Sequence, residues 1–230
     1  MKGKLIVVEG TDGSGKTVQT NLLVERLSSE GHKVQTTDFP QYGKSFFANM
    51  IEHYLKGEFG WPQALRKVSP YLASLLYAGD RWEAGGQMHK WLDDGDIIIS
   101  NRYVCSNMAH QGAKISNAGE RKKFFEWIEE LEYKVYAIPK PDITIYLHVP
   151  IEISRELIKA RAKESEGLKS KVDLHEGDIR YMQGVQETYM ELADSDSNWF
   201  TIECTKDNQM KPREEIAEEI WNTVITRMDK

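Results

Sequence analysis

The 230-residue sequence has few cysteines and no long apolar run. Two cysteines, Cys105 and Cys204, are too few for a disulfide framework and lack the paired spacing of a zinc site. Apolar runs such as those at 5–8, 97–99 and 143–147 are far shorter than the roughly 20 residues that a transmembrane helix needs. The N-terminal segment has no apolar stretch of signal-peptide length. We therefore expect a cytoplasmic protein in a reducing compartment, without a membrane partner.

An excess of basic residues is also absent. Thirty Lys and Arg residues against 36 Asp and Glu residues give a net charge of −6 and a pI near 5.6. Proteins that coat duplex DNA are normally basic overall, so we expect no nucleic-acid polymer as a partner. A local basic pocket for a small anion remains compatible with this balance. No linker or repeat divides the chain, which predicts a single domain over residues 1–230.

Short apolar runs alternate along the chain with segments of helical periodicity. Runs with the composition of buried strands lie at 4–9, 33–37, 96–100, 142–149 and 199–204. Helical segments begin near residue 16 and are also expected at 45–56, 70–92, 120–136, 151–162, 178–193 and 214–228. This alternation predicts an α/β fold, with a five-stranded parallel sheet and helices on both faces.

The first predicted strand leads into a glycine-rich phosphate-binding motif. Its sequence is Gly10-Thr11-Asp12-Gly13-Ser14-Gly15-Lys16-Thr17, which matches G-x-x-x-x-G-K-[ST] between a strand and a helix. The glycines let successive N–H groups turn inward around phosphate oxygens. Lys16 adds a full positive charge, and the Thr17 hydroxyl can bind Mg²⁺. The motif predicts a P-loop NTPase fold that binds a nucleoside triphosphate.

Motifs of other P-loop proteins are missing. The tetrapeptide N-K-x-D, which reads guanine in GTPases, does not occur. The third predicted strand continues into Asn101-Arg102-Tyr103 instead of the paired carboxylates usual in motor ATPases and helicases. Because the carboxyl end of a central strand faces the ligand crevice, Arg102 is placed to bind an acceptor phosphate through its guanidinium fork.

Three further segments combine aromatic side chains with basic or amide groups, and they indicate a second nucleotide site. Tyr77 and Arg81 lie four residues apart on one helical face, where the ring could stack on a base and the guanidinium bind a phosphate. Amide and hydroxyl groups after Arg102 could read a base edge. The candidate residues of this site are Phe39, Pro40, Tyr42, Tyr77, Arg81, Arg102, Ser106, Asn107, His110 and Gln111.

Taken together, these segments resemble the thymidylate kinase family. The resemblance covers essentially the whole chain, and its segments keep the family's order and spacing. They are the P-loop preceded by Glu9, Phe39-Pro40-Gln41-Tyr42-Gly43-Lys44-Ser45, Asp80-Arg81-Trp82-Glu83, Asn101-Arg102-Tyr103 and Pro139-Lys140-Pro141-Asp142. The resemblance implies a homodimeric enzyme that transfers the γ-phosphate of ATP to dTMP with Mg²⁺, giving dTDP and ADP for dTTP synthesis.

The resemblance also implies roles for single residues. Tyr77 would stack on thymine, and Arg81 would bind the base edge or the phosphate. Arg102 would bind the dTMP phosphate. Asn107 and Gln111 match positions that approach the base.

Two residues depart from the family's pattern. Asn101 stands where the family usually has Asp, so it brings no negative charge to the metal, for which Asp12 and Thr17 are the expected ligands. His110 stands where an aromatic ring commonly guards the deoxyribose 2′ position. These departures put the placement of Mg²⁺ and a strict deoxyribose preference in doubt.

A polar insert near 163–176 has two interpretations. As a lid, it would close over ATP and its cations would stabilise the transferring phosphoryl group. As a solvated loop, its charges would have no role. Some family members carry a catalytic basic residue in the P-loop, where this chain has Gly13 and Ser14. The resemblance therefore implies that a catalytic cation comes from the lid instead. The expected catalytic residues are Lys16, Arg102, Asp12, Lys169 and Lys171.

Three other functions remain open on the sequence. The chain could phosphorylate another nucleoside monophosphate or a deoxynucleoside. Asn101 could mark a nucleotide-binding protein that has lost catalysis. A GTPase-like switch is disfavoured by the missing guanine motif.

Overall fold

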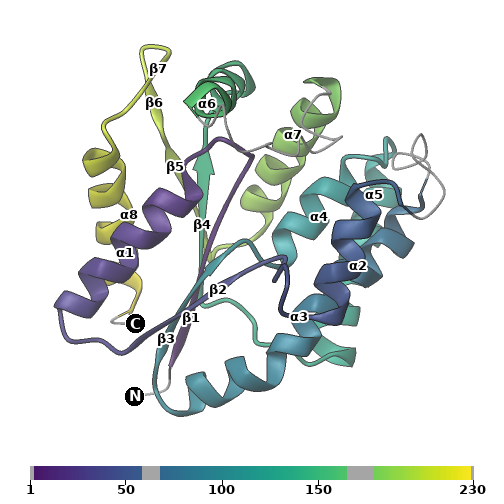
Figure 1. Ribbon diagram of the computed structural model, residues 1–230, viewed down its shortest axis with the longest axis horizontal. Coiled ribbons are helices and arrows are strands. Elements are labelled where there is room, and N and C mark those ends of the chain that lie inside the picture. The colour runs from purple at the N-terminus through teal and green to yellow at the C-terminus, as the bar shows by residue number, and fades with distance from the viewer. Residues whose placement is uncertain (1–2, 59–67, 165–178, 229–230) are drawn as a thin grey trace.

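Five parallel strands form the centre of the computed structural model, which describes residues 3–58, 68–164 and 179–228 (Figure 1). The strands lie in the order β2-β3-β1-β4-β5, so β1 is central. Their bounds are β1 Lys4–Gly10, β2 Val34–Asp38, β3 Ile97–Asn101, β4 Ile143–His148 and β5 Trp199–Glu203. The predicted α/β fold with a five-stranded parallel sheet is confirmed.

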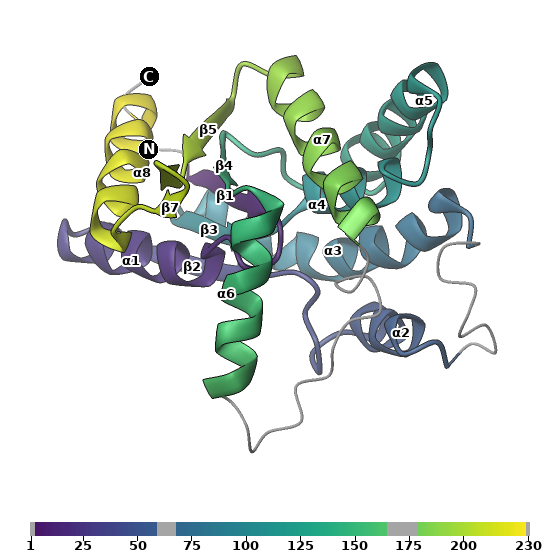
Figure 2. The same cartoon turned by 90° about the horizontal axis from the view of Figure 1, so that it is seen from above.

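Helices cover both faces of this sheet, as Figure 2 shows from above. One face carries α1 and α8, and the other carries α3, α4 and α7, with α5 packed against α4. α2 packs on α3. The bounds are α1 Lys16–Ser29, α2 Phe46–Leu55, α3 Pro70–Asp93, α4 Val104–Gly112, α5 Ala118–Glu129, α6 Ile151–Glu164, α7 Ile179–Ser195 and α8 Arg213–Met228. No helix among the described residues is long and apolar enough to cross a bilayer.

The three central strands, β3, β1 and β4, are buried along almost their whole length because helices cover both faces of the sheet there. Leu5 and Val7 of β1 face the cluster under α3, α4 and α7, whereas Ile6 and Val8 face the cluster under α1 and α8. All four side chains are fully buried. Two well-packed cores therefore hold the carboxyl ends of the strands in fixed positions.

Three elements differ from the sequence-based expectation. The segment expected as one helix at 120–136 divides into α5 and a π-helix, η1 Glu130–Val135. The helix α4 was not expected, because several of its polar side chains point into a cavity and obscure its apolar periodicity. A short hairpin of β6 Thr205–Lys206 and β7 Gln209–Met210 follows β5.

Candidate active site

The P-loop joins the carboxyl end of β1 to the first turn of α1. Lys16 Nζ donates to the Thr11 carbonyl at 2.9 Å and lies 3.8 Å from Asp12 Oδ1. Gly13 has a φ of +81°, and a Cβ there would lie 2.6 Å from the Ser154 carbonyl oxygen, so only glycine fits. Burial and the charge of Arg102 lower the pKa of Lys16 to about 7. Burial in the loop thus disfavours the charged form of the lysine, although the carboxylates of Asp12, Glu9 and Asp38 favour it.

Arg102 connects the P-loop to the end of β3. Its backbone has a φ of +66°, unusual for a residue with a side chain, and its N–H donates to the Val8 carbonyl at 3.0 Å. Its guanidinium Nη1 donates to Ser106 Oγ at 3.1 Å, and Nη2 forms an ion pair with Asp12. Burial opposes the charge of Asp12, but Arg102 and Lys16 hold the pKa of that carboxyl well below its usual value. The Asp12–Arg102 pair therefore joins the P-loop to the neighbouring cavity.

Glu9, fully buried at the end of β1, fixes the start of α4. Its Oε1 accepts the N–H groups of Tyr103 at 2.8 Å and Ser106 at 3.1 Å. Its Oε2 accepts the hydroxyls of Ser106 at 2.6 Å and Tyr189 at 2.9 Å. A carboxylate at a helix N-terminus satisfies N–H groups that have no partner within the helix. Glu9 thereby positions Ser106 against Arg102, a role that the sequence analysis did not assign.

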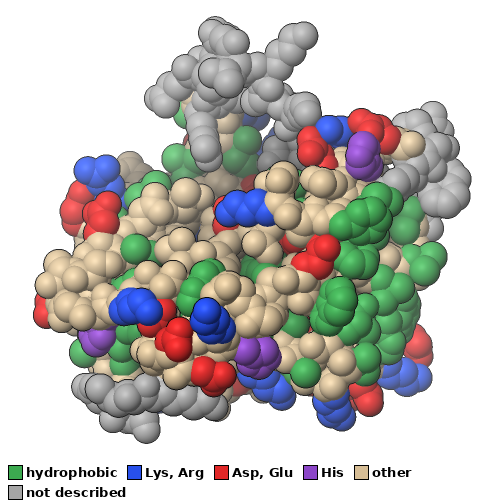
Figure 3. Space-filling view, turned by 60° about the horizontal axis from the view of Figure 1, so that its bottom comes forward, with side chains coloured by type: hydrophobic (Ala, Val, Ile, Leu, Met, Phe, Trp, Pro, Cys, Tyr) green, Lys and Arg blue, Asp and Glu red, His purple; other side chains and the backbone are tan. Residues whose placement is uncertain are grey.

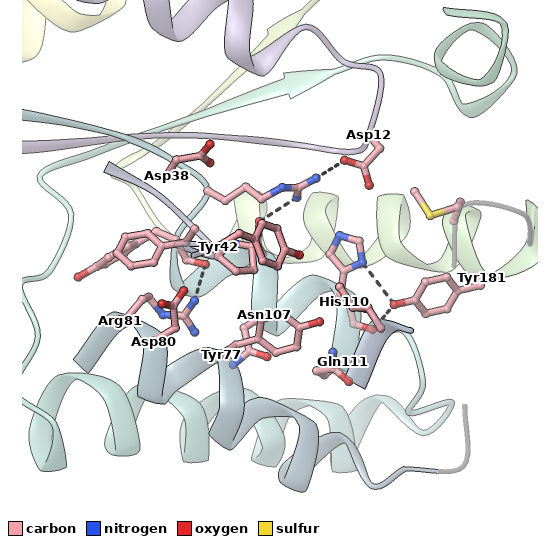
Figure 4. A pocket seen from close by; sticks show the side chains of 17 residues that line it. Asp12, Asp38, Tyr42, Tyr77, Asp80, Arg81, Asn107, His110, Gln111 and Tyr181 are labelled. Carbon is pink, nitrogen blue, oxygen red and sulfur yellow. Dashed lines mark hydrogen bonds and ion pairs between the residues drawn. The ribbon is translucent and has the colours of Figure 1, made fainter. Parts of the chain in front are cut away.

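All ten residues predicted for the second nucleotide site line one cavity next to the P-loop (Figure 4). Figure 4 shows Asp12 and Asp38 on one side of the cavity, with Tyr77, Arg81 and Asn107 opposite. The lining also contains residues that were not predicted: Asp38, Leu55, Asp80, Tyr103, Tyr181 and Met182. Asp80 and Tyr103 belong to two of the motifs that carry the family resemblance, and Asp38 directly precedes a third. Tyr181 and Met182 come from the distant helix α7 and left no local signal.

Asp80 of α3 holds the loop that carries the aromatic wall of the cavity. Its Oδ2 accepts the Gln41 N–H at 2.9 Å, and its Oδ1 accepts the Ser45 hydroxyl at 2.5 Å. Ser45 in turn caps α2 by accepting the Ala48 N–H at 2.9 Å. Burial raises the pKa of Asp80. The loop and α2 are thus attached to α3 through one buried side chain.

Arg81 forms a buried ion pair with Glu132, a residue that was not predicted from the sequence. Its Nε and Nη2 each lie 2.5 Å from a carboxylate oxygen of Glu132 in η1. The side chains of Arg81 and Glu132 are 2% and 0% exposed. The charge of Arg81 is therefore compensated, which suits contact with a neutral base better than contact with a phosphate.

The far end of the cavity is formed by α4 and α7. His110 Nδ1 lies 3.3 Å from the Tyr181 hydroxyl, which itself donates to the His110 carbonyl at 2.9 Å. Gln111 Oε1 accepts from Lys114 Nζ at 2.8 Å. These contacts place the imidazole and the amide at the cavity wall.

Oxygen atoms suitable for Mg²⁺ gather at the ends of β2 and β3. Asp38 and Asn101 are register partners, so their side chains leave the sheet on the same face, the one that carries α1. Asn101 Oδ1 is buried and has no hydrogen-bond partner among the described residues. Partial burial raises the pKa of Asp38, although Arg102, Lys16 and Lys44 oppose this.

These oxygens, with the Thr17 hydroxyl and Asp12, form a donor set that fits a hard cation. Thr17 is exposed at the start of α1. No group of three or more His, Cys, Asp or Glu residues within the described ranges could alone hold a metal ion. Mg²⁺ usually takes one or two carboxylates together with water and substrate phosphates, and the residues present match that requirement.

The predicted lid cations cannot be placed. Lys169 and Lys171 lie outside the described residues, as does most of the predicted lid at 163–176. The described residues before this segment end with α6, and the described chain resumes with α7.

Comparisons with known proteins identify the family that this chain resembles. A family model described as thymidylate kinase matches residues 8–216. The chain is 32% identical over 189 residues to a thymidylate kinase of Mycobacterium tuberculosis, covering 82% of this chain and 85% of that protein. It is 33% identical over 229 residues to a thymidylate kinase of Prochlorococcus marinus, covering 96% and 97%. The solved thymidylate kinase of Candida albicans has a similar fold, with a TM-score of 0.70 and 24% identity over 98% of this chain and 92% of that one.

Proposed function

The chain belongs to the thymidylate kinase family, and from this premise we propose which residues bind each substrate and which stabilise the transferring phosphoryl group. The enzyme transfers the γ-phosphate of ATP to dTMP, giving dTDP and ADP. ATP binds on the P-loop with its phosphates beside Lys16, and dTMP binds in the adjacent cavity. The Asp12–Arg102 ion pair, which joins the two compartments, is the observation that carries this assignment.

In this arrangement Arg102 binds the phosphate of dTMP and holds its oxygen toward the P-loop. Lys16 and Arg102 then offset charge on the phosphoryl group as it transfers through a loose transition state. No general base is required, because the acceptor phosphate already carries an anionic oxygen. Tyr77 stacks on the base, and the α4 residues Asn107 and Gln111 face its edge.

Mg²⁺ is proposed as the cofactor because the oxygen donors beside the P-loop suit it. Thr17, Asp12, Asp38 and Asn101 would hold the ion and its water molecules. When bound, Mg²⁺ would neutralise negative charge on the ATP phosphates. Asp38 then supplies, from the neighbouring strand, the negative charge that the chain lacks at Asn101.

We also propose a homodimer that works in the cytoplasm. Large apolar side chains are exposed on α2, α3 and η1, on the side of the molecule where Figure 3 shows hydrophobic groups gathered. They are Phe46, Tyr71, Leu72, Trp82 and Val135. A second copy of the chain would cover this face, since patches of this kind are otherwise rare on monomers. Both cysteines are buried free thiols, which suits a reducing compartment.

Release of ADP from ATP and Mg²⁺, measured with each nucleoside monophosphate in turn, tests the proposed function. We expect the highest kcat/KM with dTMP and loss of turnover by orders of magnitude in Lys16→Ala, because this side chain acts on developing charge. A higher kcat/KM for dCMP or dGMP would overturn the choice of acceptor. Near-normal activity of Lys16→Ala would overturn the role of the P-loop lysine.

A further inference from the structure

Glu132 lies in the π-helix η1 and contacts two side chains that line the acceptor cavity. Its carboxylate is completely buried and bound by Arg81 at 2.5 Å through both Nε and Nη2. Its Oε1 also lies 3.5 Å from Asn107 Nδ2. Single π-turns often occur at functional sites. Glu132 itself is not among the residues that line the cavity, but Arg81 and Asn107, the two side chains that its carboxylate contacts, are.

The neighbours of Asn107 determine which end of its amide faces the cavity. Asn107 Nδ2 lies 3.4 Å from the Ser74 carbonyl oxygen and 3.5 Å from Glu132 Oε1. Both neighbours are pure acceptors, so the NH₂ group must lie on their side. Asn107 Oδ1 is buried and has no hydrogen-bond partner among the described residues. A buried acceptor without a partner is costly, and a ligand N–H would satisfy it.

Arg81 places hydrogen-bond donors next to the Asn107 oxygen, which is an acceptor. Glu132 binds Nε and Nη2, whereas the one hydrogen bond of Nη1 within the described residues is a long one, 3.4 Å to the Tyr103 carbonyl. Arginine can only donate, so the remaining N–H capacity suits a carbonyl oxygen of a ligand. The ion pair leaves this part of the cavity nearly neutral, which suits an uncharged base.

We propose that Glu132 is a positioning residue for base selection, and this rests on the proposed function. By holding Arg81 as a donor and Asn107 as an acceptor, it selects a pyrimidine edge that carries a ring N–H beside a carbonyl. Thymine and uracil have this edge. Cytosine has a ring nitrogen acceptor beside an amino group, so both of its groups would meet like partners.

The test compares acceptors within each variant. In Glu132→Gln the new amide can donate to Asn107, which frees Asn107 to turn. We expect the ratio of kcat/KM for dTMP to that for dCMP to fall by about 10- to 100-fold, mainly through the KM of dTMP. The dTMP to dUMP ratio should stay within about threefold, because these bases share the same edge. Such ratios do not depend on the fraction of folded enzyme.

Two further variants keep the proposal testable. The double variant Arg81→Gln/Glu132→Gln leaves no unpaired buried charge and should lose the same discrimination, so poor folding of the single variant would not hide the effect. Glu130→Gln, an exposed neutralisation in the same π-helix, is the matched control and should keep the wild-type ratio.

An unchanged dTMP to dCMP ratio in the folded Glu132 variants would overturn the proposal, even if overall activity fell. An equal fall in both ratios would also overturn it, since that indicates general damage to the cavity. Failure of the proposed function would look different: wild-type enzyme itself would not prefer dTMP to dCMP.

Discussion

At the scale of single residues, the charge of Lys16 depends on what occupies the P-loop. Burial and the charge of Arg102 lower its pKa to about 7. The negative charge of a triphosphate favours the ammonium form and therefore raises this pKa. The enzyme should take up protons when ATP binds above pH 7.

We predict close to one proton taken up per ATP at about pH 8, and little uptake at about pH 6, where Lys16 is already charged. Calorimetric titration in two buffers of different ionisation enthalpy measures this number directly. In Lys16→Ala the uptake should disappear. A binding enthalpy that does not depend on the buffer at the higher pH would contradict the lowered pKa.

Asp38 and Asn101 give a second prediction at this scale. Because Asp38 is the proposed source of negative charge at the metal, Asp38→Asn should raise the Mg²⁺ concentration for half-maximal nucleotide binding about 10-fold. Asn101→Asp should lower it. Calorimetry of ATP binding at graded Mg²⁺ concentrations measures both without turnover. Asp93→Asn, an exposed neutralisation in α3, is the control, and equal behaviour of Asp38→Asn and this control would refute the role.

At the scale of elements, the packing of α2 on α3 depends on a glycine. A Cβ on Gly79 would lie 2.6 Å from the ring of Phe47, so a larger residue must push α2 away. Gly79→Ala should destabilise the protein by about 1–3 kcal/mol through overpacking. It should also raise the KM for dTMP, because Asp80 and Ser45 connect α2 to the cavity loop.

Denaturant unfolding and steady-state kinetics measure these two effects. Gly86→Ala in the same helix is the matched control, because a Cβ there meets no atom within 4 Å. That change should stabilise the helix by about 0.5–1 kcal/mol and leave the KM unchanged. If both variants behaved alike, close packing at Gly79 would not be the cause.

Helices and strands were predicted correctly from the sequence where a single hydrophobic periodicity runs through the segment. The prediction failed where polar residues that serve the cavity interrupt that periodicity. Leu5 to Val8 form an uninterrupted apolar run in β1, and the P-loop after it matches the G-x-x-x-x-G-K-[ST] spacing. α4 carries Ser106, Asn107 and Gln111 toward the cavity, so its polar residues hide its amphipathic pattern. The π-turn that buries Glu132 changes the helical register by backbone hydrogen bonds, which leave no signal in residue spacing.

At the scale of the whole molecule, the order of the strands brought the predicted segments together. Residues near 40, 80 and 105 are far apart in sequence, yet the carboxyl edge of one sheet gathers them around one cavity. Contributions from α7, such as Tyr181, could not be foreseen, since they depend on how a distant helix packs against α4. Arg81 and Arg102 line this cavity although the chain has a net charge of −6, and the carboxylates of Asp12, Asp38 and Asp80 line it as well.

The exposed apolar face gives the prediction at this scale. If a second copy covers it, Trp82→Glu should shift the protein from dimer to monomer, because a buried carboxylate without a partner is costly. Sedimentation velocity across a range of protein concentrations measures the change. Val18→Glu, an exposed apolar position on α1 away from this face, is the control and should leave the mass unaltered. A wild-type monomer at all concentrations would contradict the proposal.

The ion pair between Asp12 and Arg102 has a consequence for turnover. Under the proposed function, the phosphate of dTMP must replace the Asp12 carboxylate that Arg102 binds, so that one anion is exchanged for another. The net gain on binding is smaller than an unoccupied guanidinium would give, and the reverse exchange assists departure of the product. We therefore expect competition from the Asp12 carboxylate to weaken phosphate binding at Arg102 and to favour release of the product.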